Sequence, residues 1–124
     1  MGTKKMIFII DDDPGIVELA REVLEENNFE IRTASSEEGG LELLHETTPD
    51  LVLCDMMMEE IDSGVRIVQE LRKRNSEIPV FLMSNIGNAT ARYMDLNTMG
   101  FSGVIQKPIS SEKLIETVRG ALGL

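Results

Sequence analysis

Residues 6–15 read MIFIIDDDPG, a short apolar run that ends in three consecutive carboxylates, a proline and a glycine. Five apolar residues are the usual length of a buried strand and too few for a buried helix. The proline and glycine stop the strand, and Asp13 can cap a following helix in which apolar residues recur at helical spacing. The stretch therefore predicts a buried strand, a turn that carries Asp11 and Asp12, and a helix.

The same pattern of an apolar strand followed by an amphipathic helix recurs along the whole chain. Strands are predicted at 6–10, 29–33, 51–54, 79–83 and 104–106. Helices are predicted around 16–24, 41–44, 65–71, 91–99 and 114–122. Ser35 or Ser36 can cap the second helix, and Ser110 can cap the last one. Continuously apolar strands that alternate with helices are typical of a parallel sheet covered on both faces, and right-handed crossovers favour an open, doubly wound α/β sheet.

Length and composition limit the classes of protein that the chain can belong to. With 124 residues it is long enough for one domain, which we expect to span 1–124, with a frayed or vector-derived start at 1–5. The net charge of −10 disfavours binding to nucleic-acid phosphates. The longest apolar run has five residues, so we expect neither a membrane span nor a signal peptide. A single cysteine, Cys54, excludes an internal disulfide and fits the reducing cytoplasm. Gly123 and Leu124 are compatible with a natural end or with a further domain after them.

Polar side chains stand where four of the predicted strands end. The first strand ends in Asp11 and Asp12, the third in Asp55, the fourth in Ser84 and the fifth in Lys107. In the strand order 2-1-3-4-5 of doubly wound sheets, the three carboxylates would meet across one strand spacing of about 4.8 Å. They would repel one another unless positive charge lies among them, and either a hard divalent cation such as Mg²⁺ or Lys107 can supply it. A carboxylate, a cation and a hydroxyl together suit phosphoryl transfer to the carboxylate.

Four segments carry a resemblance to a known family. They are IIDDDP at 9–14, PDLVLCD at 49–55, PVFLMS at 79–84 and the pair Lys107-Pro108. In this order, each at the end of a predicted strand, they resemble the receiver domain of response regulators, the chemotaxis-regulator-like (CheY-like) module of two-component signalling. The resemblance covers essentially the whole chain and implies a flavodoxin-like sheet of five parallel strands in the order 2-1-3-4-5.

The resemblance implies a phosphorylation site with a bound metal ion. Asp55 would accept a phosphoryl group from the phosphohistidine of a histidine kinase or phosphotransfer protein, or from a small phosphodonor. Mg²⁺, or Mn²⁺ in its place, would be bound directly by Asp12 and Asp55, through water by Asp11, and by the backbone carbonyl of Met57. Such a domain modifies itself and dephosphorylates itself, and is not an enzyme that turns over a small substrate.

The resemblance also implies how the phosphorylated state signals. Ser84 would hydrogen-bond the phosphoryl group, Lys107 would pair with it, and the bond between Lys107 and Pro108 would be cis. Phosphorylation would then shift a conformational equilibrium. The partners would be a kinase and an unknown effector or output domain, without direct contact to nucleic acid or membrane, and two copies could associate through the fourth and fifth βα units.

Four positions depart from the family pattern. Val104 stands where an aromatic switch residue is usual, so the switch is expected to be atypical. Glu59 replaces a common proline, Ser63 is a one-residue insertion, and Asn85 stands where the family usually has a small residue.

Three other functions share part of this pattern. A pseudo-receiver that binds partners without phosphate would explain Val104 and the altered loop. A haloacid-dehalogenase-type phosphatase would use Asp11 and Asp13, but no acidic pair follows the lysine on a strand, since only the helical Glu112 and Glu116 come after it. A flavin-binding domain would need a phosphate cradle after the first strand, where the three aspartates would repel a phosphate.

Overall fold

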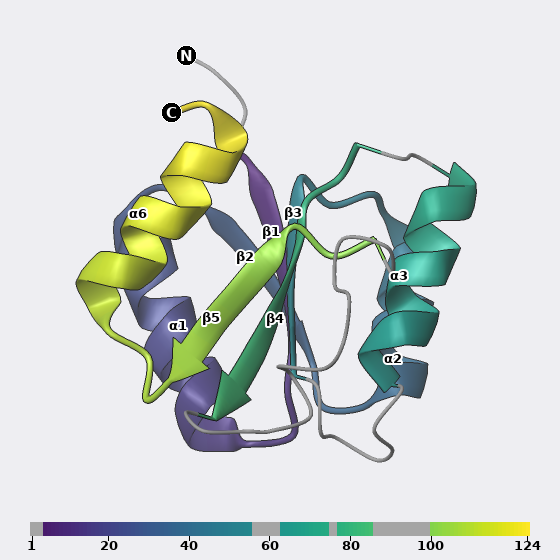
Figure 1. Ribbon diagram of the computed structural model, residues 1–124, viewed down its shortest axis with the longest axis horizontal. Helices are drawn as coiled ribbons and strands as arrows, with labels where there is room; N and C mark the ends of the chain where they lie inside the picture. The colour runs from purple at the N-terminus through teal and green to yellow at the C-terminus, as the bar shows by residue number, and fades with distance from the viewer. Residues whose placement is uncertain (1–3, 56–62, 75–76, 86–99) are drawn as a thin grey trace.

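Five strands form one sheet in the computed structural model, which describes residues 4–55, 63–74, 77–85 and 100–124. The strands are β1 (Met6–Ile10), β2 (Glu30–Ala34), β3 (Leu51–Asp55), β4 (Val80–Asn85) and β5 (Gly103–Lys107). All neighbours run parallel, in the order β2-β1-β3-β4-β5 (Figure 1). The predicted fold class and strand order are therefore confirmed.

The described helices cover both faces of this sheet. They are α1 (Pro14–Glu26), α2 (Glu37–Glu46), α3 (Ser63–Arg74) and α6 (Ser111–Leu122). Helices α1 and α6 lie on one face, and α2 and α3 lie on the other (Figure 1). In the described part of the chain, none of them has the length and apolar character of a membrane span. The helix predicted around 91–99 lies outside the described residues.

Side-chain caps start three of the helices where the sequence predicts them. Asp13 accepts hydrogen bonds from the backbone N–H groups of Gly15 and Ile16 at the start of α1. Ser36 accepts one from Gly39 at α2. Ser110 accepts one from Lys113 at α6. Each cap satisfies N–H groups that have no partner within the helix.

The central strands are buried on both faces, which explains their continuous apolar sequence. Ile7 and Ile9 of β1 pack in the core beneath α1 and α6. Phe8 and Ile10 point the other way and pack beneath α2 and α3. Full burial of each such side chain is worth roughly 1.5–3 kcal/mol, so these four residues alone contribute substantially to the free energy of unfolding.

Helices α2 and α3 approach each other closely at a glycine. A Cβ atom at Gly40 of α2 would lie 2.8 Å from Cδ1 of Ile10 and 3.1 Å from Cδ1 of Ile67 in α3. The two glycines at 39–40 weaken the helix in isolation, but here the missing side chain lets α2 pack tightly on β1 and α3.

Arg72 joins α3 to two connections of the sheet. Its guanidinium donates to the carbonyl of Ile78 (2.8 Å) ahead of β4 and to that of Gly100 (2.6 Å) ahead of β5. Gly100 has a φ of +99°, and a Cβ atom there would lie 2.7 Å from Cγ1 of Val68. Glycine at this position satisfies both the left-handed backbone and the contact with α3.

Candidate functional site

Three carboxylates meet at the carboxyl edge of β1 and β3. Ile10 of β1 pairs with Cys54 of β3, so Asp11 and Asp55 leave the sheet at the same level. One carboxylate oxygen from each of Asp11, Asp12 and Asp55 lies within 4.8 Å of the other two. Asp11 and Asp55 are buried, whereas Asp12 is exposed. The structure thus brings together the three acids that the strand ends predict to meet.

Lys107 reaches these acids from the edge strand β5. Its Nζ lies 3.1 Å from Oδ2 of Asp11 and 3.4 Å from Oδ1 of Asp55. Burial alone would lower the pKa of the Lys107 ammonium, but the two carboxylates outweigh burial and raise that pKa. Lys107 is therefore a fixed positive charge at neutral pH, and it touches the predicted phosphoacceptor.

The surroundings of the Asp11 carboxylate disfavour its charged form. It is 1% exposed, and its Oδ1 accepts a hydrogen bond from the backbone N–H of Asp13 at 2.9 Å. Burial and the nearby Asp55 raise its pKa, and this rise is only partly opposed by the Asp13 hydrogen bond and by Lys107. Its buried Oδ2 is paired with the Lys107 ammonium at 3.1 Å.

This donor set fits a hard divalent cation. Mg²⁺ and Mn²⁺ prefer oxygen ligands, and all three gathered side chains are carboxylates. A bound cation would offset the mutual repulsion of the three carboxylates. The residues present therefore match the ion that the sequence predicts.

The predicted phosphoryl-binding hydroxyl lies one strand away from Asp55. Asp55 pairs with Met83 of β4, and the buried Ser84 comes next along that strand. On the other side, Ser84 pairs with Gln106 of β5. The Lys107–Pro108 peptide bond is cis.

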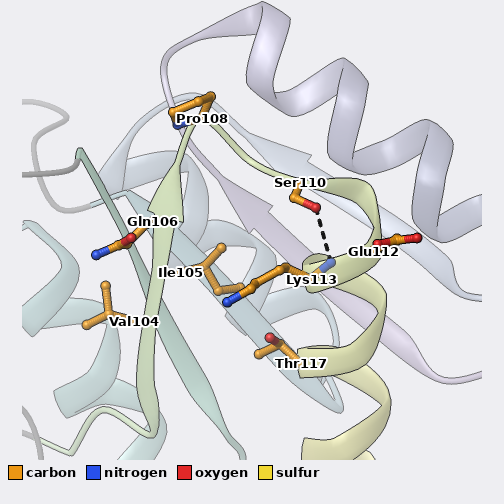
Figure 2. Close-up of a pocket in the computed structure, with 8 residues that line it drawn as sticks. All are labelled: Val104, Ile105, Gln106, Pro108, Ser110, Glu112, Lys113 and Thr117. Atoms are coloured by element: carbon orange, nitrogen blue, oxygen red, sulfur yellow. Dashed lines mark hydrogen bonds between the residues drawn. The ribbon is translucent and has the colours of Figure 1, made fainter.

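Val104 lies on the edge strand β5, three residues before Lys107. It pairs with Leu82 rather than with Ser84, and it is 39% exposed. In Figure 2, Val104 and Gln106 project from one side of β5, while Ile105 lies toward α6. These residues line a groove of about 620 Å³ beside the first turns of α6. Among the described residues, Val104 therefore lines an open groove, at the position where the resemblance implies an aromatic ring.

Four predicted site positions lie wholly or partly outside the described residues. Met57 and Glu59 fall in the segment 56–62. The side chains of Ser63 and Asn85 are also outside the description, although their backbones lie in α3 and β4.

One charged pair near the site carries no signal in the sequence. Glu37, the first residue of α2, is buried and forms an ion pair with Arg66 of α3 at 3.2 Å. Burial raises the pKa of the Cys54 thiol, and the carboxylates of Asp55, Asp11 and Glu37 raise it further. Glu37 is thus a buried carboxylate that contributes to the raised pKa of this thiol. A glutamate in the first turn of a helix is common on the surface, so only the packing reveals this one.

Comparison with known proteins identifies the family. A family model described as the response regulator receiver domain matches residues 7–119. The chain belongs to this family. As a receiver domain it is a module of two-component signalling, and the site above lies where that module's strands end.

Relatives of this receiver domain include longer proteins. It is 32% identical, over 98% of its length, to "Probable transcriptional regulator ycf27" of Guillardia theta, of which it covers 47%. It is 30% identical to the DNA-binding dual master transcriptional regulator RpaA of Synechocystis sp., over 94% of this chain and 48% of that protein. The chain thus spans about half the length of these relatives.

A solved structure shows the same domain architecture. The receiver domain of NtrX from Brucella abortus superimposes with a TM-score of 0.83 and 27% identity, over 94% of this chain and 98% of that one.

Proposed function

We propose that this receiver domain accepts a phosphoryl group on Asp55. The donor is the phosphohistidine of a sensor histidine kinase or of a phosphotransfer protein, and small phosphodonors can replace it. The observation that carries the proposal is that the Asp55 carboxylate lies 3.4 Å from the Lys107 ammonium, in a cluster of acids built at the carboxyl ends of adjacent strands.

In the proposed reaction, an Asp55 carboxylate oxygen attacks the phosphorus. The new O–P bond forms as the N–P bond of the phosphohistidine breaks, and the imidazole nitrogen keeps the electron pair. Lys107 orients the carboxylate and pairs with the phosphoryl oxygens, and Ser84 donates a hydrogen bond to them. Asp12, Asp55 and the Met57 carbonyl would hold Mg²⁺ or Mn²⁺ directly and Asp11 through water, and the bound ion would supply further neutralisation of the phosphoryl charge.

Hydrolysis of the acyl phosphate returns the free carboxylate, so the domain acts as a timed switch and not as an enzyme on a small substrate. The phosphorylated form signals by shifting a conformational equilibrium. Because Val104 provides no ring to rotate, the readout differs from the usual aromatic switch. We expect the domain to act in the cytoplasm on an effector or output domain, with association of two copies through the β4–β5 side as a further prediction.

A phosphate-independent pseudo-receiver is the second candidate, and the exposed Val104 is the observation that favours it. The phosphatase alternative is weaker, because the second aspartate that it needs, Asp13, already accepts two hydrogen bonds as the cap of α1.

Intact-mass measurement after incubation with acetyl phosphate, with and without Mg²⁺, tests the proposal. We expect a Mg²⁺-dependent gain of one phosphoryl group that is abolished in Asp55→Asn. Full labelling of Asp55→Asn would overturn the assignment. If the folded protein gains no mass, a stable beryllofluoride adduct would indicate rapid dephosphorylation, and absence of the adduct would support the pseudo-receiver.

A further inference from the structure

The Lys107 side chain reaches the acidic cluster across a whole strand. Its backbone, on the edge strand β5, pairs with Asn85 of β4, whereas Asp55 ends β3 and Asp11 follows β1. The side chain therefore crosses the end of β4, and it is only 11% exposed. Lysine side chains are rarely buried to this degree unless they are paired. The two carboxylates thus hold the ammonium in this position.

The ammonium lies closer to Asp11 than to the predicted phosphoacceptor. Its Nζ is 3.1 Å from Oδ2 of Asp11 and 3.4 Å from Oδ1 of Asp55. The other oxygen of Asp11, Oδ1, accepts the backbone N–H of Asp13 at 2.9 Å. Both oxygens of this fully buried side chain thus have a partner from within the protein. A cation that binds Asp11 must therefore displace the ammonium or lie beside it, and both are unfavourable.

The charges of the cluster lead to the same conclusion. Three carboxylates gather here, and the ammonium in contact with two of them leaves a net charge of −2. This partial neutralisation lowers the repulsion between Asp11 and Asp55 when no cation is bound. It also lowers the attraction of the cluster for a divalent cation. Lys107 thus stabilises the cluster and weakens cation binding at the same time.

We propose that Lys107 is the internal counter-ion of the acidic cluster and competes with the divalent cation for Asp11. This inference rests on the proposed function and deepens it, because it makes the ammonium and the cation alternatives at one carboxylate. In this role Lys107 acts through Asp11 and is distinct from its proposed contact with the phosphoryl group.

The test removes the ammonium and measures cation binding without any phosphodonor. Even with the full screening of water, a unit positive charge roughly 6 Å from a divalent cation changes its affinity by about tenfold. We therefore expect Lys107→Met to bind Mn²⁺ about tenfold more tightly than the parent, measured by electron paramagnetic resonance on the unphosphorylated protein. If Lys107→Met does not fold in the absence of a cation, Lys107→Gln carries the same expectation, because its amide can still donate a hydrogen bond to the carboxylates.

Lys113→Met is the matched control. Lys113 lies in the first turn of α6 and is exposed, and its loss changes the net charge of the chain by the same amount. Its Mn²⁺ affinity should stay close to that of the parent, because solvent screens an exposed charge.

A double-variant cycle tests whether Asp11 is the point of competition. In an Asp11→Asn background the ammonium has lost its nearer carboxylate, so adding Lys107→Met should raise Mn²⁺ affinity by clearly less than it does in the parent. An effect of the same size in both backgrounds would show that Lys107 acts only through the overall charge of the site, and would overturn the proposed competition for Asp11.

The direction of the first result is also decisive. Weaker Mn²⁺ binding in a Lys107→Met or Lys107→Gln variant that circular dichroism shows to be folded would mean that Lys107 organises the acids for the cation and does not compete with it. A gain no larger than that of Lys113→Met would equally overturn the inference. If the parent protein neither labels nor forms a beryllofluoride adduct, the proposed function fails, and the Mn²⁺ affinities still decide the role of Lys107.

Discussion

At the scale of single residues, Asp11 is the clearest case of a group whose surroundings disfavour its charged form. Its carboxylate is almost completely buried, and it faces Asp55 as well as Lys107. Burial raises its pKa, which means that its ionised form destabilises the folded state when no metal is bound. A residue that costs stability in this way is expected where the charge serves binding.

This leads to a prediction about pH. In EDTA, Asp11→Asn should have a higher free energy of unfolding than the parent at pH 7, because the amide keeps the hydrogen bond from Asp13 without the buried charge. The advantage should shrink as pH falls through the raised pKa of Asp11, and should vanish below about pH 4, where the carboxyl is protonated in both states. Urea unfolding across this pH range measures the difference in stability between Asp11→Asn and the parent. If the advantage of Asp11→Asn were smaller at pH 7 than at pH 4, the prediction would be contradicted.

At the scale of elements, the connection before β5 is held to α3 by Arg72 and by the close contact at Gly100. Gly100→Ala should lower the free energy of unfolding by about 2–4 kcal/mol, because it adds a methyl group against Val68 and strains a left-handed backbone. The measurement is the midpoint of urea unfolding.

Gly120 is the matched control for this substitution. It lies within α6, and a Cβ atom there would meet nothing within 4 Å. Gly120→Ala should raise the free energy of unfolding by roughly 0.5–1 kcal/mol through helix propensity. If Gly100→Ala and Gly120→Ala changed the free energy of unfolding equally, the contact of residue 100 with α3 would make no contribution to stability.

The elements also show how far sequence reasoning extends. The limits of β1 follow from the sequence, because the apolar run ends where the acids and Pro14 begin. The predicted start of β2 at Phe29 is wrong by one residue, because the Phe29 N–H bonds to the carbonyl of Leu24 at the end of α1 and its ring packs in the core. The apolar residue type predicts that Phe29 is buried. Which residues form the hydrogen bonds of the sheet, however, depends on the neighbouring strand.

The candidate site was predictable to the same degree. Parallel strands must bring their carboxyl ends together, so the meeting of Asp11, Asp12, Asp55 and Lys107 follows from strand order. The burial of Glu37 does not follow from any local pattern, because it depends on how α2 crosses α3.

At the scale of the whole molecule, the excess of acidic residues gives a net charge of −10, and the cluster concentrates part of it at one edge. A ligand that binds only the folded state stabilises it, so Mg²⁺ at ten times its dissociation constant should add about 1.4 kcal/mol to the free energy of unfolding. For a domain of this size that corresponds to a rise in Tm of roughly 3–6 °C.

Thermal unfolding with and without Mg²⁺ measures this effect, with Asp12→Asn as the comparison. Asp12 is exposed and caps no helix, so its loss should remove most of the Mg²⁺-dependent rise in Tm while changing the Tm in EDTA little. An undiminished rise in Asp12→Asn would place the metal elsewhere.

The groove beside Val104 also makes the molecule open to optical study. The chain contains no tryptophan, so a single one introduced by Val104→Trp would be its only indole fluorophore. The half-exposed position and the surrounding 620 Å³ give the indole room without disturbing the core. Its emission wavelength and its quenching by iodide would then report, in real time and without a label, whether phosphorylation of Asp55 changes the environment of residue 104 at the edge of the sheet.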